Sequence, residues 1–409
     1  MFLLVGASVR ALMESAVESG YPVMGIDFFG DLDSRRCGKT LGLVSDLGLE
    51  PTVRNLLHVA QGTNCQGLVY ASGPENHSDE LSFWEERGLL CGNRISVVKQ
   101  VRDPWQLRQA LTEIGVSMPA FYSVGCWNPD EAVAGERGWL LKPLNRGGGH
   151  GITELPRDKK AALARLSALT NPGDYIVEEY ISGVPASVTF LADGDQAVVL
   201  GTSRQLTGIK GLNKQPFVYA GNIVPLDSSL WPELRTLDAD LLRISRHLTS
   251  VFGLKGLNTL DFIVNSAGIW VLELNPRWSA SVELIEKWRG ERLFSLHIAA
   301  CIGKGQTDIP FGTESYRTFK QSFAGFWGKS IVYAQSSFEI RKQAYSDIDL
   351  LYERGVRDIP LVGTKIEKGQ PICTVLSEAD SDAACWQSLQ RKAEWARRIF
   401  GDAESSAAY

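Results

Sequence analysis

Clustered cysteines, long apolar runs and a surplus of positive charge are all missing from this 409-residue sequence. The seven cysteines are scattered and form no C-x-x-C pair, so we expect reduced thiols in a cytoplasmic protein rather than disulfides or a zinc site. No apolar run is long enough to span a membrane, and the apolar residues 1–5 lack the features of a signal peptide. The formal net charge of −5 argues against nucleic acid as a partner.

Two common nucleotide-binding motifs are also missing. Residues 2–70 predict alternating strands and helices, a Rossmann-like beginning, but Gly6 does not open a G-x-G-x-x-G run. Asp27 falls where such a domain places a ribose-binding acid; a purely structural role is the alternative, and the missing glycines favour it over NAD binding. A P-loop of the form G-x-x-x-x-G-K-S/T is absent too. Residues 71–76 follow a predicted strand and are a candidate substrate-facing loop, because ligands bind beyond the carboxyl ends of such strands.

Residues 260–275 contain two apolar stretches joined by turn-forming residues, which predicts a β-hairpin. Side chains two positions apart on a strand share one face, so Glu273 and Asn275 point the same way, and strand pairing can bring Asp261 beside them. Such oxygen ligands suit Mg²⁺, which substrate phosphates usually complete. Arg277 shares this parity and would add positive charge near those phosphates. A hairpin with scattered charges is the alternative.

Glycine is concentrated in one loop. Residues 145–151 read Asn-Arg-Gly-Gly-Gly-His-Gly and follow a short apolar stretch that contains Lys142. Glycines allow backbone conformations closed to other residues, so this loop can fold its N–H groups around phosphate oxygens. Lys142 would add a point charge. A surface turn is the alternative interpretation.

Two further stretches have a functional and a structural interpretation, and a third precedes a predicted helix. Residues 175–181 predict a buried strand whose end can form an adenine edge site, or one more structural strand. Residues 204–214 are polar and basic, which is typical of a clamp for an anionic substrate or of a solvated loop. Residues 97–99 precede a helix that we expect to start at Asp103 and Pro104.

The order of these motifs resembles the ATP-grasp superfamily over about residues 91–300. A lysine, then a lysine-proline with a glycine loop, then V-E-E-Y-I-S-G and then D-F-I…E-L-N-P-R carry the resemblance. It implies an α/β protein with an ATP-grasp fold, in which two subdomains trap ATP. We expect a Rossmann-like domain at residues 1–90, the ATP-grasp domain at 91–305, and a small β-rich module with a terminal helix at 306–409.

The resemblance also implies a role for each candidate site residue. The ligands of ATP and Mg²⁺, with Mn²⁺ as the alternative ion, divide into four groups. The phosphates would contact Lys99, Lys142 and the loop Gly147, Gly148, Gly149, His150 and Gly151; adenine would contact Glu178 and the backbone of Glu179, Tyr180 and Ile181; the metal would bind Asp261, Glu273 and Asn275; and Arg277, with Lys142, would be catalytic. Residues 184–187 depart from the family pattern for a ribose-binding acid, so that contact is left unassigned.

The implied activity is that of an ADP-forming ligase, which activates a carboxylate as an acyl phosphate and joins it to an amine. The layout resembles predicted carboligases, whose relatives are associated with one-carbon cofactor biosynthesis. We expect small-molecule carboxylate and amine substrates, and a homodimer as an alternative to a monomer. An ATP-dependent carboxylase or a small-molecule kinase using the same site is the alternative activity. A non-catalytic nucleotide sensor is a third hypothesis, against which the set of Asp261, Glu273, Asn275 and Arg277 argues.

Overall fold

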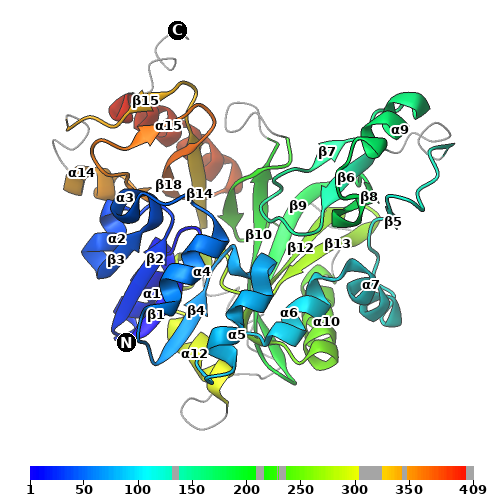
Figure 1. The fold of residues 1–409 in the computed structure, drawn as a ribbon, viewed down its shortest axis with the longest axis horizontal. Coiled ribbons are helices and arrows are strands. Elements are labelled where there is room, and N and C mark those ends of the chain that lie inside the picture. Colours follow the sequence, from blue (N-terminus) through cyan, green and yellow to red (C-terminus); the bar gives the residue numbers. More distant parts are fainter. Residues whose placement is uncertain are drawn as a thin grey trace.

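The computed structural model describes residues 1–130, 138–208, 216–227, 229, 236–303, 325–342 and 348–401. Its first part is a four-stranded parallel sheet in the order β3-β2-β1-β4, with helices packed around it (Figure 1). The elements are β1 (Phe2–Val5), α1 (Arg10–Glu18), β2 (Val23–Asp27), α2 (Leu32–Cys37), β3 (Lys39–Gly42), α3 (Leu43–Leu47), α4 (Val53–Gln61), β4 (Gly67–Tyr70), the 3₁₀ helix η1 (Pro74–Leu81) and α5 (Ser82–Glu85).

The parallel sheet confirms the Rossmann-like beginning, and its details explain the missing glycine motif. A Cβ on Gly6 would lie 2.8 Å from the Cβ of Ala71, so this glycine serves the close approach of two strand ends. Asp27 is fully buried, and its carboxylate accepts hydrogen bonds from the backbone N–H groups of Val9 and Gly30 at 3.2 and 2.7 Å. The structural interpretation of Asp27 is therefore the one that the geometry supports.

A second, small sheet with the order β5-β8-β6-β7 lies at the opposite end of the molecule (Figure 1). Pro104 follows Asp103, whose side chain caps the next helix by accepting from the N–H of Trp105 at 2.9 Å. The elements are α6 (Ile95–Arg102), α7 (Pro104–Glu113), β5 (Phe121–Ser123), β6 (Trp139–Pro143), β7 (Thr153–Glu154), α9 (Lys159–Ser167), η2 (Pro172–Asp174) and β8 (Tyr175–Glu179).

An eight-stranded sheet with the order β13-β12-β9-β10-β11-β14-β18-β16 forms the centre of the molecule. Its strands and flanking helices before the C-terminal part are β9 (Val184–Asp193), β10 (Ala197–Thr207), β11 (Tyr219–Val224), α10 (Leu237–Phe252), β12 (Lys255–Asn265), β13 (Gly268–Asn275), α11 (Val282–Arg289) and α12 (Phe294–Ile302). The C-terminal elements are β14 (Phe326–Tyr333), β15 (Phe338–Glu339), α14 (Ile348–Glu353), β16 (Val356–Arg357), β17 (Lys365–Ile366), β18 (Pro371–Ala379) and α15 (Asp382–Phe400).

The C-terminal strands are continuous with the central sheet. β14 pairs with β11 on one side and with β18 on the other, so the predicted module at residues 306–409 shares a sheet with the predicted ATP-grasp domain. The division into three domains stays a prediction. None of the described helices is long and apolar enough to cross a membrane.

A buried charge cluster joins the N-terminal helix α1 to the rest of the molecule. Arg10 donates to Glu283 of α11 at 3.1 Å and to Asp358 at 3.0 Å, and Lys329 of β14 donates to Glu283 at 3.0 Å. Buried charges are costly unless they are paired. The N-terminal sheet is therefore held in a defined place beside the central sheet, which matters for the candidate site.

Acid should destabilise the fold through His297. This histidine is buried on α12, where Nδ1 accepts from the N–H of Leu257 at 3.0 Å and Nε2 donates to the carbonyl of Cys91 at 3.1 Å. Burial lowers the pKa of His297 to about 4. As the pH falls, His297 is therefore protonated in the unfolded chain before it is protonated in the folded protein. The contribution of neutral His297 to the free energy of unfolding is complete above the unfolded pKa, and it falls by about 2 kcal/mol between pH 7.5 and 5.

Urea unfolding at both pH values measures this loss against His297→Gln, whose amide can keep one acceptor and one donor. We expect the variant to lose about 2 kcal/mol less than the wild type over this interval. Equal losses in the two proteins would contradict the assignment.

Candidate active site

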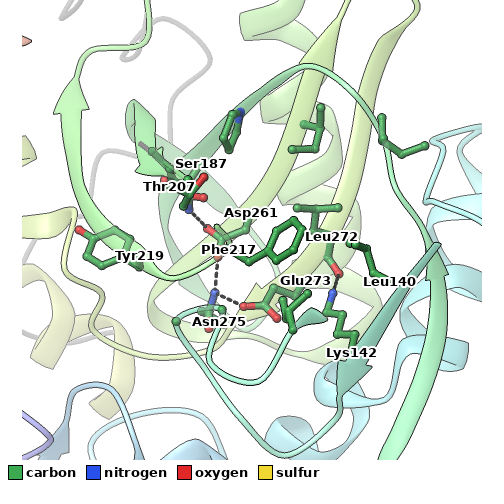
Figure 2. A pocket seen from close by; sticks show the side chains of 18 of the residues that line it. Leu140, Lys142, Ser187, Thr207, Phe217, Tyr219, Asp261, Leu272, Glu273 and Asn275 are labelled. Carbon is green, nitrogen blue, oxygen red and sulfur yellow. Dashed lines mark hydrogen bonds between the residues drawn. The ribbon is translucent and has the colours of Figure 1, made fainter. Parts of the chain in front are cut away.

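A cavity of about 510 Å³ lies between the small sheet and the central sheet. This volume is typical of sites for small molecules and cofactors. Figure 2 shows Lys142, Asp261, Glu273 and Asn275 close together in it. The predicted site residues that line the cavity are Lys142, Gly148, Gly149, Glu178, Glu179, Tyr180, Ile181, Asp261, Glu273, Asn275 and Arg277; Lys99, Gly147, His150 and Gly151 are not among the lining residues.

The predicted hairpin is present as β12 and β13. Asp261 lies directly opposite Glu273 in the pairing, and a register shift follows between Asp261 and Phe262. The side-chain amide of Asn275 donates to Asp261 at 2.9 Å and to Glu273 at 3.4 Å (Figure 2). The three side chains that sequence reasoning grouped are thus in mutual contact at one wall of the cavity.

The chemistry of this donor set fits a divalent cation. Burial, and then the neighbouring Glu273 carboxylate, raise the pKa of Asp261 to about 7. Burial opposes ionisation of Glu273 as well, but Arg102 and Lys142 outweigh it and lower the pKa of this carboxyl. Among the described residues no three His, Cys, Asp or Glu side chains gather as a metal site. A Mg²⁺ ion would therefore use two carboxylates and the Asn275 oxygen, after the amide turns over, and would be completed by phosphates and water.

Lys142 projects from β6 into the cavity. Its ammonium donates to both carboxylate oxygens of Glu178 at 3.2 Å and to the carbonyl of Leu272 at 3.5 Å. Burial alone would lower the pKa of Lys142, but Glu178 raises it above the usual value. The side chain of Glu178 thus holds Lys142, which is a fixed positive charge in the cavity, and the adenine contact of Glu178 stays a prediction.

The backbone at the end of β8 is only partly open to a ligand. The N–H of Glu179 donates to the carbonyl of Ala120 at 2.7 Å, and the N–H of Tyr180 donates to that of Gly138 at 2.8 Å. Both donors are therefore used within the protein. An adenine contact at residues 179–181 stays a prediction, and it would have to use other backbone groups than these two.

The glycine loop packs against the segment before β11. The N–H of Tyr219 donates to the carbonyl of Gly148 at 3.0 Å, which joins the loop to the central sheet. Gly148 and Gly149 have φ values of +64° and +76°, in the region that favours glycine. A Cβ on Gly149 would also overlap the carbonyl oxygen of Phe217. These two glycines therefore allow the loop to close over one side of the cavity.

The position of Lys99 corrects one prediction. The segment around it is helical, and Lys99 lies in α6 with a side chain that is 54% exposed and paired with Asp79 on the surface. Arg102, at the end of the same helix, is only 13% exposed, and its guanidinium lies 3.7 Å from Glu273. The sequence analysis did not predict Arg102 as a site residue. The one signal for it in the sequence is its position at the end of a helix, directly before the capping residue Asp103.

The predicted basic clamp is also corrected in part. Residues 204–207 belong to β10, and Arg204 pairs with Asp382 of α15 at 2.7 Å instead of facing a substrate. Gln205, a polar member of the same predicted stretch, donates to Asp261 at 2.8 Å and lines the cavity. Lys210 and Lys214 lie outside the described residues.

Comparisons with known proteins agree with this geometry. Residues 101–281 match a family model described as an ATP-grasp domain. The chain is 23% identical over 287 residues to the carbamoyl phosphate synthase large chain of Clostridium beijerinckii. The aligned region covers 67% of this chain and 26% of that relative. The arginine-specific large chain of Geobacillus stearothermophilus is 25% identical over 274 residues, covering 64% and 25% of the two chains. The chain thus spans about a quarter of the length of these relatives.

Solved structures with the same fold cover almost the whole chain. The biotin carboxylase domain of the Hydrogenobacter thermophilus 2-oxoglutarate carboxylase, a dimer in complex with MgADP and bicarbonate, has a TM-score of 0.69 at 16% identity and covers 97% of this chain and 89% of its own. N5-carboxyaminoimidazole ribonucleotide synthetase from Thermus thermophilus has a TM-score of 0.67 at 14% identity, with coverage of 98% and 99%.

Proposed function

Residues 101–281 belong to the ATP-grasp domain family, and from that premise we propose that the protein is an ADP-forming ligase that joins a carboxylate to an amine. The observation that carries the proposal is a single cavity lined by the hairpin residues Asp261 and Glu273, by the half-buried Lys142 and the buried Arg277, and by the glycine loop. Phosphoryl transfer asks a protein mainly for positioning and charge neutralisation. This cavity offers both.

The proposed reaction has two steps. A carboxylate oxygen attacks the γ-phosphorus of ATP while the bond to the β–γ bridging oxygen breaks, which gives an acyl phosphate and ADP. The amine nitrogen then attacks the acyl carbon, inorganic phosphate leaves with the oxygen that joined it to the acyl group, and the amine proton goes to solvent. Closure of the glycine loop would exclude water that otherwise hydrolyses the acyl phosphate.

Each charged side chain has a part in this proposal. Asp261, Glu273 and Asn275 would hold Mg²⁺ or Mn²⁺, and the chemistry that such an ion would supply is neutralisation of the charge on the phosphates. Lys142 would contact the phosphates from β6, fixed by its pair with Glu178. Arg277 would contact the transferring phosphoryl group. Arg102, which lies beside Glu273, would take the part of the second phosphate-binding cation that was predicted for Lys99.

A carboxylase is the second candidate, because the structures that cover nearly all of this chain include biotin carboxylase domains, one of them with MgADP and bicarbonate. Its carboxylate would be bicarbonate. A homodimer also stays a prediction for this chain, supported by the dimeric form of that Hydrogenobacter thermophilus domain.

We expect ADP and phosphate release that depends on a carboxylate acceptor. The test supplies ATP and Mg²⁺ with a panel of carboxylates, bicarbonate among them, and with hydroxylamine as a trapping amine. Trapping of a hydroxamate together with ADP supports the ligase, since only an activated acyl group reacts in this way. Activity with bicarbonate alone would favour the carboxylase. Formation of AMP, or of a stable phosphorylated product, would contradict both.

A further inference from the structure

Arg277 is a buried cation of the cavity with a hydrogen-bond partner on each guanidinium nitrogen. Its Nε donates to Glu75 at 2.9 Å, its Nη1 to the carbonyl of Trp278 at 3.2 Å, and its Nη2 to the side-chain oxygen of Asn275 at 3.2 Å. Guanidinium N–H groups lie in one plane in a fixed arrangement. Partners on three of its nitrogens therefore define both the position and the tilt of this plane.

The only carboxylate hydrogen-bonded to Arg277 among the described residues comes from another part of the chain. Glu75 follows β4 of the N-terminal sheet and is separated from Arg277 by about 200 residues of sequence. Its side chain is 1% exposed, and its second oxygen accepts from the N–H of Gly73 at 2.6 Å. One oxygen of Glu75 is thus anchored to its own loop while the other holds Arg277.

The same loop holds the second arginine of the site. Asn76 accepts from the Nη2 of Arg102 at 2.9 Å, and this guanidinium also donates to the carbonyl of Arg146, in the glycine loop, at 3.2 Å. Ser72 lines the cavity itself. The loop after β4 therefore reaches both arginines that face the predicted metal and phosphates.

We propose that Glu75 is a positioning residue, which aims the Arg277 guanidinium at the transferring phosphoryl group, and that the N-terminal domain acts on catalysis through it. This inference rests on the function proposed above. It gives the N-terminal sheet a role other than nucleotide binding. The buried charge cluster around Arg10 supports it, because that cluster fixes the sheet beside the central one.

Competition between carboxylates explains why Arg277 needs a dedicated partner. Burial alone would lower the pKa of Arg277, and Glu75, followed by Asp261 and Glu273, raises it above its usual value. Asp261 and Glu273 are therefore the other anions that attract this guanidinium. Without Glu75, Arg277 would shift toward the two predicted metal ligands and away from the phosphoryl position.

The variant Glu75→Gln tests this with little change of shape. We expect kcat to fall about 100-fold, the size that a misplacement of about 1 Å can cost, while KM for ATP stays within about twofold and the half-saturating Mg²⁺ concentration rises. The matched control is Glu80→Gln on the same η1 segment, whose side chain pairs with Arg54 outside the cavity. Thermal melting and calorimetric binding of ADP without metal report on folding independently of activity.

A double-mutant cycle with Arg277→Lys separates positioning from a general structural role. If Glu75 acts through Arg277, adding Glu75→Gln to Arg277→Lys should change kcat less than threefold. A full 100-fold loss in both backgrounds, or unchanged kcat in Glu75→Gln alone, would overturn the inference. If Glu75→Gln melts early, Glu75→Asp replaces it in the cycle, and the same two outcomes decide. A wild type that splits no ATP with any acceptor would instead refute the proposed function.

Discussion

Replacing Glu273 with glutamine should lower Mg²⁺-dependent turnover by roughly a thousandfold. Glu273 lies opposite Asp261 in the hairpin and is the more acidic of the two, because Arg102 and Lys142 outweigh its burial. Glutamine keeps the size and one oxygen but removes the charge. A metal ion that stabilises the transition state contributes several kcal/mol, and a loss of about 4 kcal/mol corresponds to this change in rate.

Three readouts make the Glu273→Gln result specific. Melting temperature and ADP binding in the presence of a chelator should match the wild type, because the change opens no cavity. The matched control is Glu113→Gln. Glu113 is an exposed residue at the end of α7, where it lies near His247 of α10, and its variant should keep full activity. Turnover within tenfold of the wild type for Glu273→Gln would remove the hairpin from the metal site.

Alanine at Gly149 should be the second severe change, with kcat reduced at least about 100-fold. The added Cβ would overlap the backbone carbonyl oxygen of Phe217 when the glycine loop packs as it does here. A backbone atom cannot move aside as a side chain can, so the loop must stay away from β11. Loss of closure affects the transition state more than the bound nucleotide, so KM for ATP should change little.

Gly148→Ala separates this overlap from the cost of the backbone conformation. Gly148 has a similar positive φ, but a Cβ there meets nothing closer than 3.5 Å, in the ring of His150. The left-handed conformation alone costs roughly 1–2 kcal/mol, so we expect a loss of about tenfold. Equal effects of the two alanines in stopped-flow and steady-state assays would show that closure onto Phe217 is not part of the reaction.

Local pattern was sufficient for much of the fold. The spacing of apolar residues in residues 237–252, followed by Gly253, predicts α10 with the bounds that the structure shows. Strand parity predicted that Glu273 and Asn275 share a face, and the predicted pairing of the two strands added Asp261. In each case the evidence is contained within some 20 neighbouring residues, over which apolar periodicity and turn-forming residues determine the type of element and its bounds.

Partners far apart in the sequence could not be predicted in this way. The pair of Glu178 with Lys142 was not predicted, because it forms only when β6 and β8 pair in the small sheet. Glu75 lies in η1 after the N-terminal sheet and Arg277 follows β13 of the central sheet, and nothing near either residue indicates the other. Lys99 was assigned to the phosphates through the resemblance to the ATP-grasp superfamily. The exposure of a helical residue depends on what packs against the helix, and here Lys99 forms a surface ion pair with Asp79.

The most direct test of the central claim follows oxygen from the carboxylate. With a carboxylate substrate from the hydroxamate panel carrying ¹⁸O in both oxygens, ATP, Mg²⁺ and the amine, the proposed acyl phosphate transfers one ¹⁸O to inorganic phosphate. Mass spectrometry should find singly labelled phosphate in a one-to-one ratio with ADP. Label in AMP, or unlabelled phosphate formed together with the ligated product, would contradict carboxylate activation by phosphoryl transfer at this site.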